Sequence, residues 1–319
     1  MNLAERLRDL QAGGGLDLPP PGRGNTAERH RRLAAIGRQD LALARLAEGH
    51  ADALAILADV GRAPEPGALY AVWASETSHC SLRLERGTDG LRLNGSKMFC
   101  TGAGLVDQAL VTVSAPERLL IRVDLRGNER SIRFEPNHWH TPAFRDTQTS
   151  TTNFIDTPAA CEDVLGGEGW YLERPGFWHG ACGPASCWAG GAAGLLDYAL
   201  AQARNDAHTL AHLGAMRAAN WGMLACLDSA GNEIDAGPAD QEAAFTRALS
   251  VRHLIEQACS DVLHRFLRAY GPRPIAFDAA VSKRYYELDL YLRQSHAERD
   301  LEALGQKLVS RGQDCPSPS

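Results

Sequence analysis

Several features that would assign the chain to a broad class are missing from its 319 residues. It contains no run of about 18 apolar residues, the length needed to cross a membrane, so we expect no transmembrane segment. The stretch from Met1 to Leu10 is charged and lacks the apolar core of a signal peptide. No metal-ligand spacing, phosphate-binding glycine loop or nucleophile elbow occurs. We therefore predict neither a bound metal nor membrane attachment.

An excess of positive charge and paired cysteines are also missing. The formal net charge is −6, which argues against a general nucleic-acid binder. The eight cysteines show no Cys-x-x-Cys spacing, and the closest pair, Cys182 and Cys187, is expected to fill apolar space. Such cysteine usage favours a reducing compartment, so we predict a cytoplasmic protein.

What the chain does contain is the composition of an ordinary globular protein, with 44% apolar and 23% charged residues. Residues 1–67 form the predicted N-terminal helical segment. Its residues 12–24 are rich in glycine and proline, and helical periodicity follows them. It predicts one helical stretch from Thr26 to Gly61, where glycine and nearby prolines end it. His50 lies on the apolar stripe of this stretch, where a hydrogen-bonded core histidine is expected rather than a ligand-binding one.

The periodicity changes twice along the chain. Short apolar runs separated by turns such as Arg126-Gly-Asn128 predict a small β-sandwich or barrel over residues 68–165. Residues 166–319 return to helical spacing, with helices expected at 190–218, 240–270 and 277–309 and a disordered tail at 314–319. Short loops between these helices predict an antiparallel bundle. The predicted fold class is α+β, with N-terminal helices, a central β-domain and a C-terminal bundle.

The most informative segment runs from Leu91 to Gly104. Its Asn94-Gly95 pair between alternating apolar runs predicts a hairpin turn. The second strand would then place Phe99 and Thr101 on one face, because strand side chains alternate. The glycine run from Gly102 to Gly104 allows backbone to approach a ligand closely. A hairpin that binds nothing explains the same pattern.

This segment resembles the flavin-facing strand of the acyl-CoA dehydrogenase family, which reads Asn-Gly-x-Lys-x-Trp-x-Thr-Asn-Gly. In that family the aromatic packs by the isoalloxazine ring and the threonine bonds its reactive edge. Here Phe99 replaces the tryptophan, Thr101 keeps the hydroxyl and Gly102 replaces the asparagine. The order of helices, β-domain and bundle is also similar to the family's, although the N-terminal helical part is shorter. The resemblance implies FAD held where the β-domain meets the bundle.

Two further segments carry parts of the resemblance. Tyr70 to Glu76 resembles the strand and loop that hold the flavin pyrimidine and pyrophosphate, with Trp73 near the usual threonine; Ser75, Thr77 and Ser78 are the remaining hydroxyl candidates. Arg204 matches the arginine that pairs with a flavin pyrophosphate across a dimer contact, which implies a homodimer or homotetramer. A strand ending in a polar turn and a solvated surface arginine are the alternative interpretations.

The family's catalytic glutamate, which removes the α-proton of an acyl thioester, has no counterpart here. One of its two positions falls at His296 or, shifted by one, at Ala297, and the other near His179. Imidazole can act as a base near neutral pH, or it can orient oxygen chemistry at a flavin, as hydroxylases of related fold suggest. A buried structural histidine on an apolar helix face is the alternative for His296. Close packing of the small residues that follow is the alternative for His179.

Three functions are compatible with these residues. The first is a flavin-dependent oxidoreductase that acts on an acyl thioester by proton abstraction and hydride transfer to FAD, served by an electron-transfer or reductase partner. The second is a flavin-dependent monooxygenase on the same fold. The third is a degenerate member that binds an acyl group or a partner protein without redox chemistry.

Overall fold

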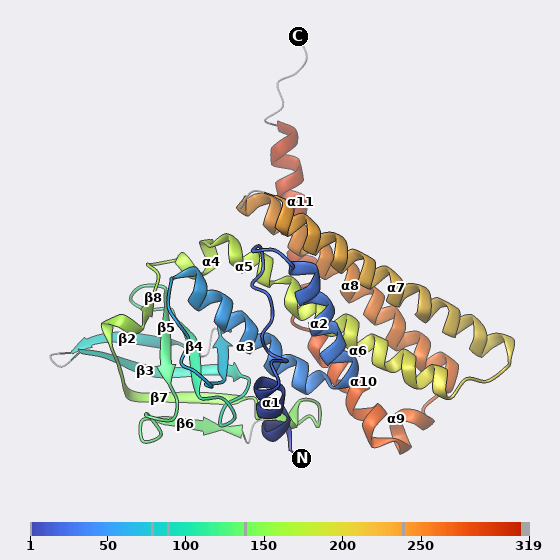
Figure 1. Ribbon diagram of the computed structural model, residues 1–319, viewed down its shortest axis with the longest axis horizontal. Helices are drawn as coiled ribbons and strands as arrows, with labels where there is room; N and C mark the ends of the chain where they lie inside the picture. The colour runs from blue at the N-terminus through green and yellow to red at the C-terminus, as the bar shows by residue number, and fades with distance from the viewer. Residues whose placement is uncertain (1, 78–79, 88–89, 137–138, 238–239, 314–319) are drawn as a thin grey trace, which may run out of the picture. The chain divides into compact units, whose positions relative to one another are not determined.

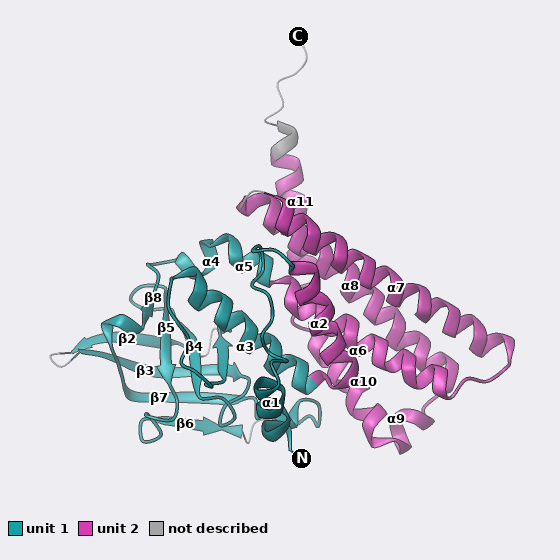
Figure 2. Cartoon of the chain, viewed as in Figure 1, with its two compact units in different colours: residues 1–25, 42–180 teal, residues 26–41, 181–319 magenta. Residues whose placement is uncertain are grey.

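The computed structural model describes residues 2–77, 80–87, 90–136, 139–237 and 240–313 (Figure 1). Its mixed α and β composition, with two small sheets and a helical C-terminal region, confirms the predicted fold class. The chain forms two compact units (Figure 2): unit 1 comprises residues 1–25 and 42–180, and unit 2 comprises residues 26–41 and 181–319. The division into domains at 1–67, 68–165 and 166–319 stays a prediction. The predicted disordered tail, residues 314–319, lies outside the described residues.

The helices of unit 1 are α1 (Leu3–Ala12), α3 (Leu41–Asp59), α4 (Trp170–Glu173) and α5 (Pro175–Gly180). The predicted helix end near Gly61 is confirmed, since α3 stops at Asp59 and Gly61 takes a φ of +65°. His50 is 3% exposed, and its Nδ1 accepts a hydrogen bond of 3.1 Å from the Tyr70 backbone N–H. The prediction of a hydrogen-bonded core histidine is therefore confirmed.

Two four-stranded sheets complete unit 1, as a small sandwich requires. The first has the order β1-β4-β5-β8, and its strands are β1 (Tyr70–Trp73), β4 (Gln108–Val113), β5 (Leu119–Asp124) and β8 (Val164–Leu165). The second has the order β2-β3-β7-β6, and its strands are β2 (Leu82–Gly87), β3 (Gly90–Cys100), β7 (Ser150–Ala159) and β6 (Ile132–Glu135). Helix α3 packs on the first sheet through a core cluster of Ala53, Ile56, Leu57, Ala68, Tyr70, Leu110, Leu120 and Leu165.

The predicted hairpin turn at Asn94-Gly95 is wrong. Strand β3 continues through both residues, and β2 and β3 pair up to Gly87 and Gly90. Gly95 has a φ of +123°, and the pairing of β3 with β7 shifts register there, which marks a bulge. A side chain on Gly95 would collide with the Ser81 carbonyl. Glycine serves a bulge for the same reason that it serves a turn, so the dipeptide does not distinguish the two.

Unit 2 contains α2 (Thr26–Gln39), α6 (Cys182–Ala201), α7 (Ala207–Ala236), α8 (Gln241–Tyr270), α9 (Arg273–Phe277), α10 (Ala279–Leu292) and α11 (Glu298–Gln313). Helices α6, α7 and α8 pack on one another (Figure 1). The predicted helix at 240–270 is confirmed by α8. No helix in the described part of the chain is long and apolar enough to cross a bilayer.

Three of the predicted helices are interrupted. The stretch 26–61 breaks at Asp40, between α2 and α3. The helix expected at 190–218 ends at Ala201, and α7 begins after Asp206, whose carboxylate caps it by accepting from the Thr209 backbone N–H at 2.8 Å. The helix expected at 277–309 stops at Leu292 and α11 starts at Glu298. Apolar periodicity continues across such breaks and therefore does not reveal them.

Small residues let α6 approach α2 closely. A side chain on Gly37 of α2 would lie 2.7 Å from the Cys187 carbonyl oxygen, and one on Gly190 of α6 would lie still closer to the Ala34 carbonyl oxygen. Cys182 and Cys187 are fully buried, which agrees with their expected role as fillers. The small residues after His179 are thus used for helix packing.

Candidate functional site

The turn that follows β3 is the centre of the candidate site. The strand ends at Cys100, and Phe99 takes a left-handed φ of +58°, so the expectation that Phe99 and Thr101 lie on one strand face is wrong. The left-handed residue turns the chain out of the pleat before Thr101. Phe99 is 53% exposed and packs edge-on against Trp139, with ring centroids 6.5 Å apart. A bulky residue in this backbone region is uncommon and clusters at functional sites.

Hydrogen bonds hold Thr101 in place. Its carbonyl oxygen accepts from the Trp73 indole Nε1–H at 2.9 Å, and its hydroxyl forms a hydrogen bond of 3.2 Å with the Thr149 hydroxyl. Thr147 donates its hydroxyl hydrogen to the Phe144 carbonyl at 2.7 Å, so Thr149 donates to Thr147 at 2.8 Å. The Thr101 hydroxyl then donates to Thr149, and its oxygen can still accept a hydrogen bond from a ligand. Trp73 is 1% exposed, so its hydrogen bond fixes Thr101 to the buried interior of unit 1.

The glycine run from Gly102 to Gly104 packs closely against other residues of the protein. Gly102 has a φ of +82°, and its backbone N–H donates to the Thr147 carbonyl at 2.9 Å. A side chain at Gly102 would lie 3.0 Å from Val106 Cγ1 and 3.1 Å from Leu46 Cδ2. The turn can therefore pack against α3 only with glycine at this position.

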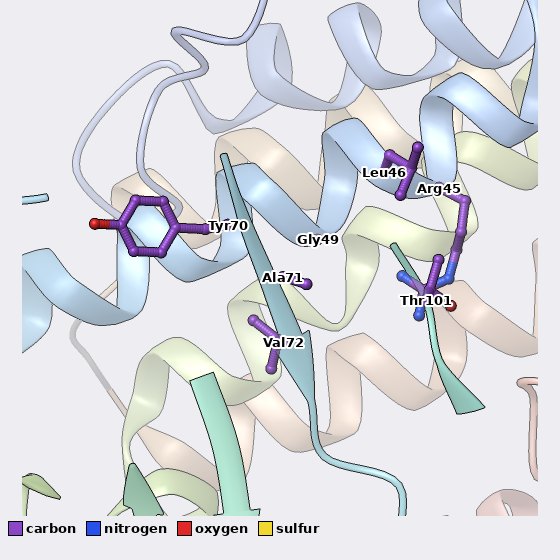
Figure 3. Close-up of a pocket in the computed structure, with 7 residues that line it drawn as sticks. All are labelled: Arg45, Leu46, Gly49, Tyr70, Ala71, Val72 and Thr101. Carbon is purple, nitrogen blue, oxygen red and sulfur yellow. The ribbon is translucent and has the colours of Figure 1, made fainter. Parts of the chain in front are cut away.

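A small cavity adjoins Thr101 (Figure 3) and is lined by Arg45, Leu46, Gly49, Tyr70, Ala71, Val72 and Thr101. Its volume of about 10 Å³ holds one water molecule at most. Arg45 extends from α3 into this region, and its guanidinium donates to Glu48 at 2.8 Å. A ring system could contact this site only from the exposed side, at Phe99.

A buried lysine fixes the loop after β1. Lys97 is 2% exposed, and its Nζ donates to Glu76 Oε1 at 2.6 Å, to the Thr112 carbonyl at 2.8 Å and to the Thr112 hydroxyl at 2.6 Å. Burial lowers the pKa of Lys97. The ion pair anchors the loop that carries Ser75, which is half-buried. Thr77 donates to Met98 Sδ at 3.7 Å, whereas Ser78 lies outside the described residues.

The structure reveals a carboxylate near His179 that the sequence pattern did not indicate. His179 is buried in α5, and a side chain on the next residue, Gly180, would lie 2.6 Å from Asp52 Oδ1. This oxygen is buried and accepts no hydrogen bond from the described residues. Burial and the Asp52 carboxylate raise the pKa of Tyr171. Asp52 lies far from His179 in the sequence, so only the fold brings the two segments together.

Arg204 lies in a basic cluster of unit 2, between α6 and α7. Its guanidinium donates to the Ala269 carbonyl, lies 5.4 Å from the Tyr270 ring centroid and is 3.8 Å from Asp206. The other members of the basic cluster come from the start of α7 and the end of α8: His208, His212, His264, Arg265 and Arg268. Positive groups gather here although the chain is acidic overall.

One ring nitrogen in the basic cluster has no hydrogen-bond partner among the described residues. His212 is 8% exposed, and its Nδ1 is buried without a hydrogen bond among the described residues. Burial, followed by the charges of His208 and the nearby arginines, lowers the pKa of His212. The rings of His208 and His212 are 4.6 Å apart. An anion at this end of the bundle would meet several donors.

His296 lies in the loop between α10 and α11, and the expectation that it shares a buried helix face is wrong. Its side chain is 65% exposed, and Nδ1 lies 3.2 Å from Asp300 Oδ1. The backbone N–H of His296 also donates to Asp300, at 3.2 Å. Arg252 of α8 holds the same loop by donating to the Gln294 carbonyl at 2.7 Å. The early end of α10 explains the error.

The predicted site residues fall into separate groups. Trp73 and Thr101 are in direct contact, with Phe99 and the anchored Ser75 loop in the same unit. Sequence reasoning missed Trp139 and Thr149, which contact Phe99 and Thr101, and Arg45, which lines the adjoining cavity. In unit 2, the loop of His296 is held at Arg252, whereas Arg204 contacts Ala269, about 25 Å further along α8. No cluster of three or more metal-binding side chains occurs among the described residues.

Comparison with known proteins identifies the fold. No family model matches the sequence, and no curated protein sequence is significantly similar to it. The dibenzothiophene monooxygenase TdsC from Paenibacillus sp. A11-2, solved with FMN and indole, superposes with a TM-score of 0.76 at 16% identity, over 99% of this chain and 97% of that chain. Butyryl-CoA dehydrogenase from Megasphaera elsdenii gives 0.79 at 15% identity, over 96% and 90%.

A third structure agrees with these two. The nitrososynthase from Micromonospora carbonacea var. africana superposes with a TM-score of 0.78 at 14% identity, over 98% of this chain and 89% of that chain. The chain therefore has the acyl-CoA dehydrogenase fold, which confirms the resemblance noted in its sequence.

Proposed function

We propose that the protein is a flavin-dependent oxidoreductase whose flavin ring lies against Phe99 and Thr101. The observation that carries the proposal is the turn after β3. There, an exposed aromatic side chain is held in a left-handed backbone beside a threonine hydroxyl whose oxygen can accept a hydrogen bond. An aromatic face suits a planar ring, and the hydroxyl suits a ring nitrogen. A bound flavin would supply hydride or electron transfer.

The phosphate of the flavin is proposed to meet the basic cluster around Arg204. Guanidinium and imidazole donors suit phosphate oxygens, and His212 Nδ1 is a buried group in need of a partner. The sequence resemblance implies FAD, whereas TdsC was solved with FMN. Separate titrations with FMN and FAD distinguish the two. In the dimer that the resemblance implies, Arg204 serves the flavin of the second copy.

Oxygen-dependent chemistry, as in a monooxygenase, is the reaction class we favour. Neither predicted base position holds a carboxylate, and His296 instead pairs with Asp300 through Nδ1. That pairing leaves Nε2 as the atom that can donate or accept a proton at a substrate. A reductase that supplies reduced flavin is then the expected partner.

Oxidation of an acyl thioester is the second candidate, and Asp52 is the observation that favours it. Its Oδ1 is buried without a partner beside the His179 segment, so the fold supplies a carboxylate where the sequence shows none. A carboxylate in such surroundings can serve as a base toward an α-proton.

The experiment separates the two reactions and tests the residues. The flavin-loaded protein is first mixed anaerobically with acyl-CoA, where bleaching of the flavin indicates a dehydrogenase. Oxygen uptake with reduced flavin and product analysis then test the monooxygenase. We expect His296→Ala to lower turnover about 10²- to 10⁴-fold with flavin still bound. His179→Ala and Asp52→Asn are measured beside it, and full turnover in all three would remove these groups from the mechanism.

A further inference from the structure

Unit 1 contains a second, larger cavity beside the paired strands β4 and β5 of its first sheet. The cavity has a volume of about 430 Å³, within the range of small-molecule sites. None of its lining residues also lines the small cavity that adjoins Thr101. Its lining includes Pro64, Glu65, Gln108, Val123, Asp124 and Pro158. The cavity is therefore separate from the proposed flavin contacts.

Gln108, which lines this cavity, carries a buried hydrogen-bond acceptor without a partner among the described residues. It is 6% exposed, and its Nε2 donates to Glu65 Oε2, whereas its Oε1 is buried without a partner in the described chain. The Glu65 carboxylate determines the orientation of the amide, because a flipped amide would set oxygen against oxygen. A buried acceptor without a donor destabilises the protein, so a ligand that donates a hydrogen bond is favoured here.

The lining carries more negative than positive side chains, which favours a cation as ligand. Three carboxylates, Glu65, Asp124 and Asp163, face one arginine, Arg122, which donates to Asp163 at 2.8 and 3.0 Å. Glu65 also accepts from Arg126 at 2.9 Å. Asp124 differs from the other two carboxylates, because its side chain accepts only a backbone N–H, at 3.1 Å, within the described residues.

The unsatisfied amide oxygen of Gln108 and the Asp124 carboxylate are neighbours. Gln108 of β4 and Asp124 of β5 are directly paired across the antiparallel ladder, so their side chains project from the same face. Pro64 and Pro158 add apolar surface to the same lining. We propose that this cavity binds a small alkylammonium ion, with its ammonium group between Gln108 Oε1 and the Asp124 carboxylate and its alkyl part on the apolar residues.

The test compares a cation with a neutral molecule of the same shape. Wild-type protein is titrated with n-butylammonium chloride and with n-butanol, and binding is followed by NMR shifts of the cavity residues. We expect saturable binding of butylammonium that weakens with added salt, and none of butanol. Gln108→Leu and Asp124→Asn should each weaken binding at least about tenfold, since each removes a hydrogen bond to a charged group. Glu129→Gln, which removes an exposed charge outside the lining, should bind as wild type.

Three outcomes would overturn the proposal: no saturable binding of butylammonium, equal binding of butanol, or wild-type affinity in Asp124→Asn. Asp124 is exposed, so this variant should fold even where Gln108→Leu does not, and thermal melting checks both. Neither the ligand nor the readout involves flavin. The result is thus independent of the proposed oxidoreductase function.

Discussion

At the scale of single residues, Thr101 carries the most direct prediction. Thr101→Val keeps the side-chain volume but removes the hydroxyl that Thr149 supports. We expect flavin affinity to fall by about 0.5–1.5 kcal/mol, the value of one hydrogen bond. The measurement is a fluorescence titration with FMN and with FAD. Thr151→Val, a half-buried threonine of β7, is the matched control; equal affinities for the two variants would remove Thr101 from the site.

His50 makes stability depend on pH. Burial lowers the pKa of His50 from 6.5 to about 4, so the unfolded chain takes up a proton at higher pH than the folded one. The neutral His50 ring does not reduce the stability of the protein above pH 6.5. As the pH falls toward 4, the free energy of unfolding decreases by about 3 kcal/mol, because the unfolded chain binds the proton first. His50→Gln retains an acceptor for the Tyr70 N–H but cannot take up this proton. Between pH 7 and pH 4 its free energy of unfolding should therefore fall by about 3 kcal/mol less than that of the wild type. Urea unfolding at several pH values measures this, and parallel curves for both proteins would refute it.

At the scale of elements, the bulge in β3 is the feature that sequence reasoning misread. Gly95→Ala would place a side chain against the Ser81 carbonyl at a φ of +123°. We expect a loss of at least about 1–3 kcal/mol in the free energy of unfolding. Gly61→Ala is the control, because Gly61 also has a positive φ but faces open space. If the two variants are equally stable, the bulge does not need glycine.

Helix breaks were the other weakness of the sequence at this scale. The extent of α8 was predicted well, because its apolar stripe is continuous and capped at Asp240. The end of α10 at Leu292 was missed, since apolar residues continue on both sides of the loop. This single error moved His296 from an exposed loop to a buried helix face in the prediction.

At the scale of the whole molecule, the fold class followed from the two changes of periodicity along the chain. The candidate site, however, is built from contacts between residues that lie far apart in the sequence. Local sequence patterns do not reveal such contacts. Trp73 reaches Thr101, Lys97 reaches Glu76, and Asp52 lies near Gly180 only once the sheets and helices have packed. The sequence resemblance indicated the turn after β3, whereas the residues that hold this turn in place are evident only in the structure.

Homodimerisation remains a prediction at this scale. The α8 stripe from Ala244 to Phe266 is buried within unit 2, so it cannot also form the dimer contact. Exposed apolar side chains on α7, including Trp221 at 68% exposure, are available instead. We expect Trp221→Glu to weaken the dimer in sedimentation experiments and Phe277→Glu, at another exposed site, to leave it unchanged. A wild-type protein that stays monomeric at all concentrations would contradict the prediction.

The most direct test of the central claim is the absorbance spectrum of the purified protein after incubation with FMN or FAD and gel filtration. We predict that one of the two flavins co-elutes at about one per chain, with the spectrum of an oxidised, protein-bound flavin. The same experiment on Thr101→Val should show weaker retention. A colourless protein after incubation with either flavin would contradict the account, and the non-redox function would take its place.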